Sequence, residues 1–167
     1  MQGVVSGMAQ NDPVTAANYV AGLPASDAQG KAALDVVNAW AQNDPQAAAN
    51  WAAGFSGDTR SQALNAVVQN WAQNDPAAAG QWLAALPDDS SKQSALQDYV
   101  NNLAGQYPEY AAAGVASLTD ASQRNSAIEN IARNWLRTDP VAAAKWLGGT
   151  ALPDNQKQQL LKDLNND

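Results

Sequence analysis

One proline recurs along the chain at a nearly constant interval, and this interval constrains the fold more than any other feature. Its positions lie 31 or 32 residues apart, at Pro13, Pro45, Pro76, Pro108 and Pro140. The neighbouring residues repeat as well, since 40–45 and 71–76 both read Trp-Ala-Gln-Asn-Asp-Pro. Near-copies of one unit therefore predict a single repeat domain over residues 1–167. The predicted units are a partial repeat at 1–12 and repeats at 13–44, 45–75, 76–107, 108–139 and 140–167.

Each unit predicts two helices. The first begins at an Asp-Pro pair such as Asp75-Pro76. The Asp side chain accepts hydrogen bonds from free N–H groups of the first turn, and Pro lacks an N–H that would have no partner there. The second begins near another acidic residue, and the predicted caps are Asp27, Asp58, Asp89, Asp120 and Asp154. Its predicted buried positions follow the helical spacing i, i+3, i+4, i+7, in Leu64, Val67, Val68 and Trp71, in Leu96, Tyr99, Val100 and Leu103, and in Ile128, Ile131, Ala132 and Trp135. The period-two alternation of strands is absent, so the sequence predicts an all-α fold.

The joints between units are short, since only Gln-Asn separates a Trp-Ala pair from the next Asp-Pro. Short joints favour antiparallel packing, which predicts a solenoid of about five antiparallel helical hairpins. The chain resembles the α-solenoid helical-repeat proteins and is tetratricopeptide-like in its period and its Asp-Pro pairs. It is also similar to the Asp-Pro-x-Ala-Ala-Ala-x-Trp repeats of uncharacterised bacterial proteins. These resemblances imply an architecture and transfer no functional residue, because the tetratricopeptide pattern Trp-x2-Leu-Gly-x2-Tyr follows none of the tryptophans.

Composition excludes several functions. The 167 residues include no His and no Cys, which rules out a thiolate nucleophile, an imidazole base and a Cys/His zinc site in this chain, and we expect no cofactor. The net charge of −7, with Lys31, Arg60 and Lys92 as the basic residues before position 121, argues against nucleic-acid binding. No apolar run approaches the ~20 residues of a membrane span. The compartment stays open; no signal peptide is evident, although abundant Asn, Gln and Ala are typical of an exported bacterial protein whose leader was removed.

The two ends of the chain also fit the second-helix pattern. Met1, Val4, Val5 and Met8 match it at the start, and Leu160 and Leu164 match it in a final helix that we expect to run to Asp167. An array that begins within a unit would expose an apolar stripe on its first helix. Three interpretations stay open: a fragment of a longer array, a unit that stacks end to end, and a frayed monomer.

The tryptophans and the repeated aspartates each allow a structural and a functional interpretation. The tryptophans form either a ladder of stacking platforms or part of the core, and their positions in the helical pattern favour the core; they are Trp40, Trp51, Trp71, Trp82, Trp135 and Trp146. The Asn-Asp-Pro aspartates form either a row of cation ligands or helix caps. Capping is favoured, because one carboxylate per unit cannot supply the six to eight oxygens of a calcium site.

The first helix of each unit carries small residues on its non-core face, in the pairs Ala17 and Ala21, Ala49 and Ala53, Gly80 and Ala84, Ala112 and Ala116, and Ala144 and Gly148. A polar residue adjoins these pairs, at Asn18, Asn50, Gln81 and Lys145, with Ala113 in the fourth unit. These four are candidate partner-binding residues, in a shallow groove suited to an extended peptide or a partner helix. The alternative is that small residues simply permit close helix packing.

The fourth unit departs from the pattern. Tyr107 replaces the capping Asp, Leu103 and Gly114 replace two aromatic residues, and Tyr110 appears four residues before Gly114. Tyr107 and Tyr110, with Glu109, are candidate anchors for a partner. The alternative is local repacking, in which Tyr110 fills the volume that Gly114 leaves.

These observations favour a non-enzymatic scaffold that binds a protein or peptide. The first alternative is a structural unit that self-associates through its terminal repeats. The second is a glycosidase working with two carboxylates, which needs neither His nor Cys. It ranks last, because Glu109 and Glu129 are the only glutamates and most aspartates are expected to cap helices.

Overall fold

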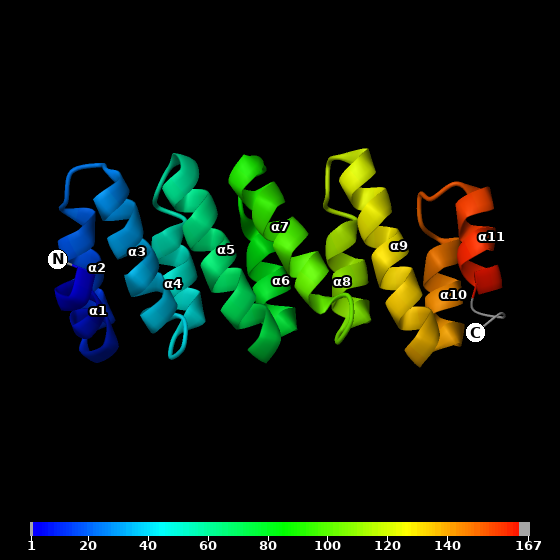
Figure 1. Ribbon diagram of the computed structural model, residues 1–167, viewed down its shortest axis with the longest axis horizontal. Coiled ribbons are helices and arrows are strands. Elements are labelled where there is room, and N and C mark those ends of the chain that lie inside the picture. The colour runs from blue at the N-terminus through cyan, green and yellow to red at the C-terminus, as the bar shows by residue number, and fades with distance from the viewer. Residues whose placement is uncertain (1, 164–167) are drawn as a thin grey trace.

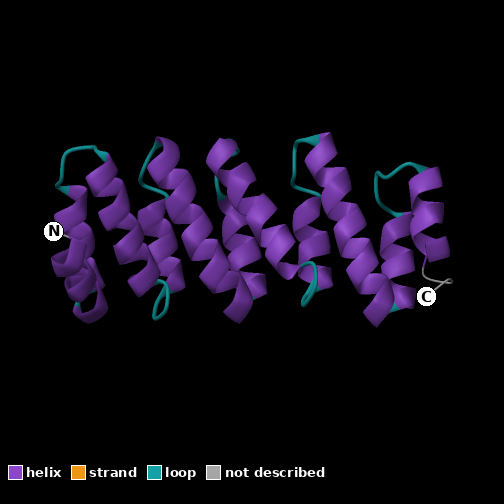
Figure 2. Ribbon diagram, in the orientation of Figure 1, coloured by secondary structure: helices purple, strands orange, loops and turns teal. Residues whose placement is uncertain are grey.

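The computed structural model describes residues 2–163, which form helices joined by short loops (Figure 2). The range forms eleven helices and no strand, which confirms the predicted all-α fold. In chain order they are α1 (Gln2–Asn11), α2 (Pro13–Ala21), α3 (Asp27–Trp40), α4 (Pro45–Ala52), α5 (Gly57–Asn74), α6 (Pro76–Ala85), α7 (Ser90–Leu103), α8 (Pro108–Val115), α9 (Ala121–Thr138), α10 (Pro140–Gly148) and α11 (Asp154–Asp163).

The helices lie side by side in one row along the longest axis, and their connections alternate between the two edges of the row (Figure 1). Each helix packs against the next in the chain, so consecutive helices run in opposite directions. We call α2, α4, α6, α8 and α10 the A helices; they begin at the five repeated prolines and have 8–10 residues. We call the remaining helices the B helices, and within the described range they have 10–18 residues.

The aspartates before the repeated prolines cap the A helices as predicted. The side chains of Asp12, Asp44, Asp75 and Asp139 each accept a hydrogen bond from the backbone N–H three residues later, at 2.9–3.0 Å. This bond satisfies one of the N–H groups that a helix start leaves without an intrahelical partner. Tyr107 holds the same position before α8 and makes no side-chain capping bond.

The predicted caps of the B helices are confirmed in part. Asp89 caps α7 through the Lys92 N–H at 2.9 Å, and Asp120 caps α9 through the Gln123 N–H at 2.8 Å. The predictions for Asp27, Asp58 and Asp154 were wrong, because these residues lie inside the first turn of their helices. Serines hold the cap positions of α3 and α5 instead, and a carboxylate in the first turn still favours the positive end of the helix dipole.

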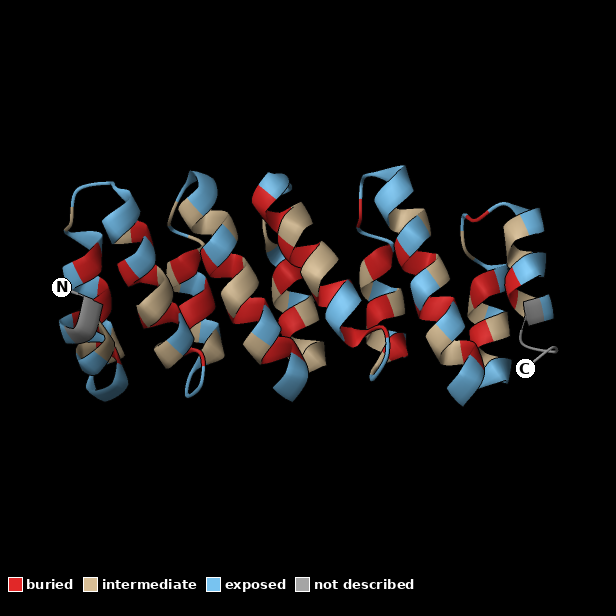
Figure 3. Cartoon of the chain, in the orientation of Figure 1, coloured by how far each residue is buried: buried red, intermediate tan, exposed pale blue. Residues whose placement is uncertain are grey.

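The core follows the predicted helical spacing (Figure 3). All four predicted positions of α5 and of α7 are buried, as are Ile128, Ile131 and Ala132 of α9. The exception in α9 is Trp135, which is half-buried. Val5 of α1 and Leu160 of α11 are buried at the two ends, while Val4 is 67% exposed. Met1 and Leu164, predicted to continue these stripes, lie outside the described residues.

The tryptophans pack in pairs, each joining the end of a B helix to the following A helix. Ring centroids lie 6.3 Å apart for Trp40 and Trp51, 6.0 Å for Trp71 and Trp82, and 5.7 Å for Trp135 and Trp146, with planes tilted by 43–45°. Trp71 is buried, and the other five are half-buried. The predicted core role is therefore confirmed for Trp71 and only in part for the others, since an indole is too large to be covered completely by its small neighbours.

Successive B helices also contact one another, most extensively at α5 and α7. Arg60 of α5 forms an ion pair with Asp89, the cap of α7. The Ser61 and Ser91 hydroxyls lie 2.8 Å apart, and the Asn65 amide donates to the Ser94 hydroxyl at 3.2 Å. Between α7 and α9, by contrast, α8 occupies much of the interval (Figure 1). No described helix has the length and apolarity that crossing a membrane would require.

Candidate functional site

The A helices form one face of the row, and hollows open between several of them. We call the hollow between α8 and α10 the C-terminal groove; its volume is about 710 Å³. We call the hollow between α6 and α8 the middle groove, of about 320 Å³. A further hollow of about 400 Å³ lies between α2 and α4. The C-terminal groove is the largest of the three and is the candidate site.

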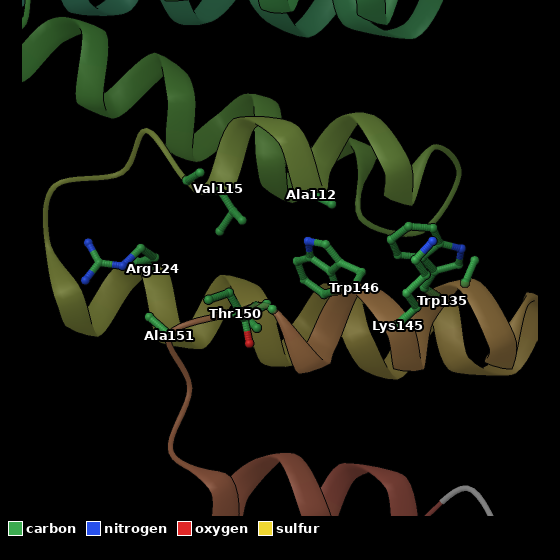
Figure 4. Close-up of a pocket in the computed structure, with 12 residues that line it drawn as sticks. Ala112, Val115, Arg124, Trp135, Lys145, Trp146, Thr150 and Ala151 are labelled. Atoms are coloured by element: carbon green, nitrogen blue, oxygen red, sulfur yellow. The ribbon is translucent and has the colours of Figure 1, made fainter.

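Three helices, α8, α9 and α10, and the loop after α10 line the C-terminal groove (Figure 4). Small side chains at α8 form one wall, and the two indoles of α9 and α10 form the floor. In the loop after α10, the Thr150 hydroxyl donates to the Leu147 carbonyl at 2.7 Å. The lining residues are Ala112, Val115, Ala116, Arg124, Ile128, Trp135, Ala142, Lys145, Trp146, Gly149, Thr150 and Ala151.

The local sequence explains why this hollow is open. The position six residues after the proline holds Trp146 in α10 but Gly114 in α8, so α8 presents no indole. On the side of α8 that faces the groove stand Ala112 and Ala116. The 5.7 Å contact with Trp135 holds Trp146 in a fixed orientation. The groove is therefore apolar, with two aromatic surfaces opposite a wall of methyl groups.

The charges that line the C-terminal groove are positive. Among the described residues that line it, the charged side chains are Arg124 and Lys145. Arg124 lies at one end, and Lys145 lies at the other beside Trp135, with Trp146 between the ends (Figure 4). An Arg124 Nη1–H group donates to the Leu118 carbonyl at 2.9 Å, which fixes the guanidinium at the mouth. Lys145 is exposed.

The middle groove is built around Tyr99, a residue of α7 that is only 2% exposed. Its hydroxyl donates to the Pro76 carbonyl at 2.8 Å. Glycines on both flanking A helices make room for the ring: a Cβ at Gly80 would lie 2.7 Å from Tyr99 Oη, and one at Gly114 would lie 3.0 Å from Tyr99 Cε1. Burial raises the pKa of Tyr99 to about 12, so this hydroxyl stays a donor at neutral pH.

The position of Tyr99 corrects one interpretation of the fourth unit. We expected Tyr110 to fill the volume beside Gly114, whereas the ring against Gly114 belongs to Tyr99. Tyr110 instead lines the middle groove, half-buried, with its ring centroid 6.4 Å from that of Tyr107 in an edge-to-face contact. Its role as a partner anchor, like that of Tyr107, stays a prediction.

The four candidate partner-binding residues of the A helices do not share one site. Asn18, Asn50, Gln81 and Lys145 are all exposed, on α2, α4, α6 and α10. Gln81 lines the middle groove and Lys145 lines the C-terminal groove. Asn50 has a structural contact, because its side-chain oxygen accepts a hydrogen bond from the Trp82 indole N–H at 3.1 Å and so links α4 to α6.

Some of the small residues in the predicted pairs pack between helices, and others line a groove. Ala17 and Ala49 are buried, and Gly80 adjoins Tyr99, so close packing explains these three. Ala112 and Ala116 line the C-terminal groove.

The sequence did not lead us to predict a recurring contact between each A helix and the B helix that follows it. After each A helix, one side chain of the next B helix donates to a carbonyl at or just beyond the end of the A helix, at 2.8–3.2 Å. The donors are Gln29, Arg60, Lys92, Arg124 and Lys157. They follow the repeated proline by 15–17 residues, a spacing that was available in the sequence. A cation there also complements the negative end of the A-helix dipole.

The carboxylates show few features of a catalytic or metal site. Glu109 is exposed, and Glu129 lies 3.5 Å from Arg133 in the next turn of α9. Burial raises the pKa of Asp98 on α7. Within residues 2–163 there is no group of three or more acidic side chains placed to hold a metal ion.

Comparisons with protein-family models, with curated proteins and with solved structures each gave no match.

Proposed function

We propose that the chain is a helical-repeat solenoid that acts as a non-enzymatic scaffold for a protein or peptide, with the A-helix face as its binding surface. The observation that carries the proposal is the C-terminal groove. It combines about 710 Å³ of open volume, two half-buried indoles and a wall of small side chains. Grooves of this kind accept apolar side chains of a partner, and aromatic residues contribute strongly to such contacts.

The row of helices supports the solenoid part of the proposal. Helix starts recur at the repeated prolines, and each helix contacts its neighbours in the chain. Stacked units of this type create long surfaces suited to extended ligands. The resemblance to tetratricopeptide-like arrays agrees with this proposal in period. The engagement of four Asp-Pro aspartates as caps, and the contact of Glu129 with Arg133, favour a non-enzymatic role.

Selection from a random peptide library tests the scaffold proposal. Peptides enriched on the wild-type protein are expected to lose at least about tenfold in affinity when Ala116→Trp fills the groove. Ala28→Trp is the matched control, because it introduces the same side chain at an exposed position of α3, far from the C-terminal groove. Circular dichroism checks that both variants remain helical. Failure to enrich any peptide, or equal binding by both variants, would contradict the proposal.

Self-association is the second candidate function, and exposed apolar residues at the first helices favour it. Val4 is 67% exposed, Val14 53% and Tyr19 45%. If these residues meet another copy, sedimentation velocity will show larger species as the concentration rises, and Val4→Lys will remove them. A single monomeric species at every concentration would exclude this role for the wild type.

A further inference from the structure

The charges of the C-terminal groove indicate the chemistry of its ligand. The chain as a whole carries a net charge of −7, yet the charged side chains that line the groove are Arg124 and Lys145. A positive site on a negative protein attracts acidic ligands and repels basic ones, because complementary potentials steer binding and penalise the wrong partner. The ligand that fits this groove therefore carries negative charge at positions that reach its two ends.

The middle of the groove requires an apolar group. Trp146 lies between the two cations and Trp135 lies beside Lys145, and both indoles are half-buried with a face or edge toward the groove (Figure 4). Ala112 and Val115 stand opposite them. An aromatic or large aliphatic side chain gains apolar burial on both sides of this space. A ligand with charge alone would leave the indoles in contact with water.

The shape of the A-helix face favours a chain rather than a compact molecule. The middle groove and the C-terminal groove lie on the two sides of α8. Between them, Ala113 of α8 and Ala116 and Ser117 of the turn after it are small and exposed, which leaves a path across the end of the helix. Tyr110 and Gln81 on the far side offer further polar contacts. An extended peptide, which advances about 3.3 Å per residue, can follow this path from one groove to the other.

We infer that the C-terminal groove binds a peptide segment in which acidic residues flank an aromatic or large aliphatic side chain. The apolar side chain inserts between Trp146 and the wall of α8, and the flanking carboxylates meet Lys145 and Arg124. Arg124 suits this task, because a guanidinium has five N–H donors and the Leu118 carbonyl engages one nitrogen. This inference rests on the proposed scaffold function and specifies its ligand.

Three rhodamine-labelled peptides test the ligand class by fluorescence anisotropy on the full chain. The first is Asp-Asp-Leu-Phe-Asp-Asp, the second replaces every Asp with Lys, and the third keeps the Asp residues but replaces Leu-Phe with Ser-Gly. We expect the first peptide to bind at least roughly tenfold more tightly than either of the others, and to bind more weakly as salt is added. Equal or tighter binding of the Lys peptide, or equal binding of the Ser-Gly peptide, would overturn the inference.

Two charge-reversal variants locate the binding site. Lys145→Glu changes the groove, and Lys31→Glu changes an exposed residue of α3 while producing the same net charge. We expect Lys145→Glu to weaken binding of the first peptide roughly tenfold and Lys31→Glu to leave it almost unchanged. Equal weakening by both variants would show that only the net charge matters and would overturn the proposed site.

A competition experiment separates a peptide from a small ligand. Indole-3-acetate supplies an aromatic ring and one carboxylate without a peptide chain. We expect it to displace the acidic peptide only at concentrations far above the dissociation constant of the peptide. Displacement at a comparable concentration would show that the groove binds small aromatic acids and would overturn the inference that its ligand is a peptide.

The random-library selection distinguishes failure of the acidic-peptide inference from failure of the scaffold proposal. If neutral or basic peptides are enriched and Ala116→Trp abolishes their binding, the scaffold function stands and the acidic ligand is wrong. If neither the library nor the three designed peptides bind, both proposals fail.

Discussion

The junction between α5 and α7 and the interval between α8 and α10 belong to the same row of repeats, yet the first is closed and the second is open. At the first junction an Arg60–Asp89 ion pair and a 2.8 Å contact between Ser61 and Ser91 hold the B helices together. The second holds a groove of about 710 Å³. The repeat period therefore sets which helices become neighbours, while individual side chains decide how closely they approach.

The junction between α7 and α9, in the third and fourth units, is held by other contacts than the junction between α5 and α7. The position of Asp89, thirteen residues after its proline, is held by Ala121 in the fourth unit. Lys92 of α7 consequently has no acidic counterpart at that position, and it pairs with Asp88 of its own unit at 3.0 Å. Gln93 contacts the loop before α9 instead, through the Ser117 carbonyl at 3.3 Å and the Thr119 N–H at 3.0 Å. Where the α5–α7 junction has an ion pair between helices, the α7–α9 junction thus has a contact between a helix and a loop.

The change in stability should be greatest when a fully buried aromatic ring, rather than one that lines the C-terminal groove, is removed. Tyr99→Ala should lower the free energy of unfolding by about 3–5 kcal/mol, because it removes a fully buried ring and its hydrogen bond to Pro76. Trp146→Ala should lower it by only about 1–3 kcal/mol, since that indole is half-buried in the open groove. Urea unfolding followed by circular dichroism measures both. Equal losses would show that the C-terminal groove is as closed in solution as the region around Tyr99.

Two glycine substitutions should have opposite effects on stability in α8 and α10. Gly114→Ala should lower the free energy of unfolding by about 1–2 kcal/mol, because the new Cβ would lie 3.0 Å from Tyr99 and 3.2 Å from Val100. Gly148→Ala in α10 meets nothing within 4 Å and should raise the free energy of unfolding by about 0.5–1 kcal/mol. Thermal unfolding should therefore shift in opposite directions. A stabilised Gly114→Ala variant would contradict the tight contact between α8 and Tyr99.

The smallest expected effect concerns the ion pair of the closed junction. A double-mutant cycle of Arg60→Ala and Asp89→Asn should give a coupling free energy of about 0.5–1 kcal/mol, since the pair is partly exposed. The Lys92 backbone N–H and the Arg60 guanidinium hold the pKa of Asp89 below its usual value of 3.8. A lowered folded-state pKa stabilises the fold above pH 3.8, and this stabilisation is lost as the pH falls below that value.

The acid unfolding curve checks this sign. Wild-type stability should fall more steeply below pH 4 than that of Asp89→Asn, and the difference should shrink at high salt. Asp120→Asn serves as the control, because Asp120 caps α9 in the same way. Identical acid profiles for the wild type and Asp89→Asn would show that this ion pair does not stabilise the junction between α5 and α7.

Sequence reasoning predicted the helix starts and the core because both depend on local patterns. Asp75 and Pro76 have the chemistry of a helix start wherever they occur, and Leu64 and Val68 lie one turn apart in any α-helix. It was less accurate for Asp27 and Asp58, since Ser26 caps α3 through the Gln29 N–H at 3.3 Å, and Ser56 precedes α5 without a side-chain capping bond. The choice between two adjacent capping residues depends on how the preceding loop enters the helix.

The candidate site was harder to predict, because it depends on contacts between different units. Lys145 and Gln81 were expected on the groove face and lie there, but the sequence did not show that Asn50 would contact Trp82 in the next unit. Nor did it show that Tyr99 would occupy the space beside Gly114. The spacing of Arg124 from its proline was a usable signal, because cations recur there in three other units.

The most direct test of the central claim, that the C-terminal groove is an open binding site, is a nitrogen-15 NMR titration of the indole N–H signals with the acidic peptide. Trp135→Phe and Trp146→Phe assign the two groove signals, and Trp71→Phe assigns the buried indole between α5 and α6. We predict that the Trp135 and Trp146 signals move as the peptide is added while the Trp71 signal stays in place. A shift confined to Trp71, or no movement of any indole signal when the peptide is in large excess, would contradict the claim.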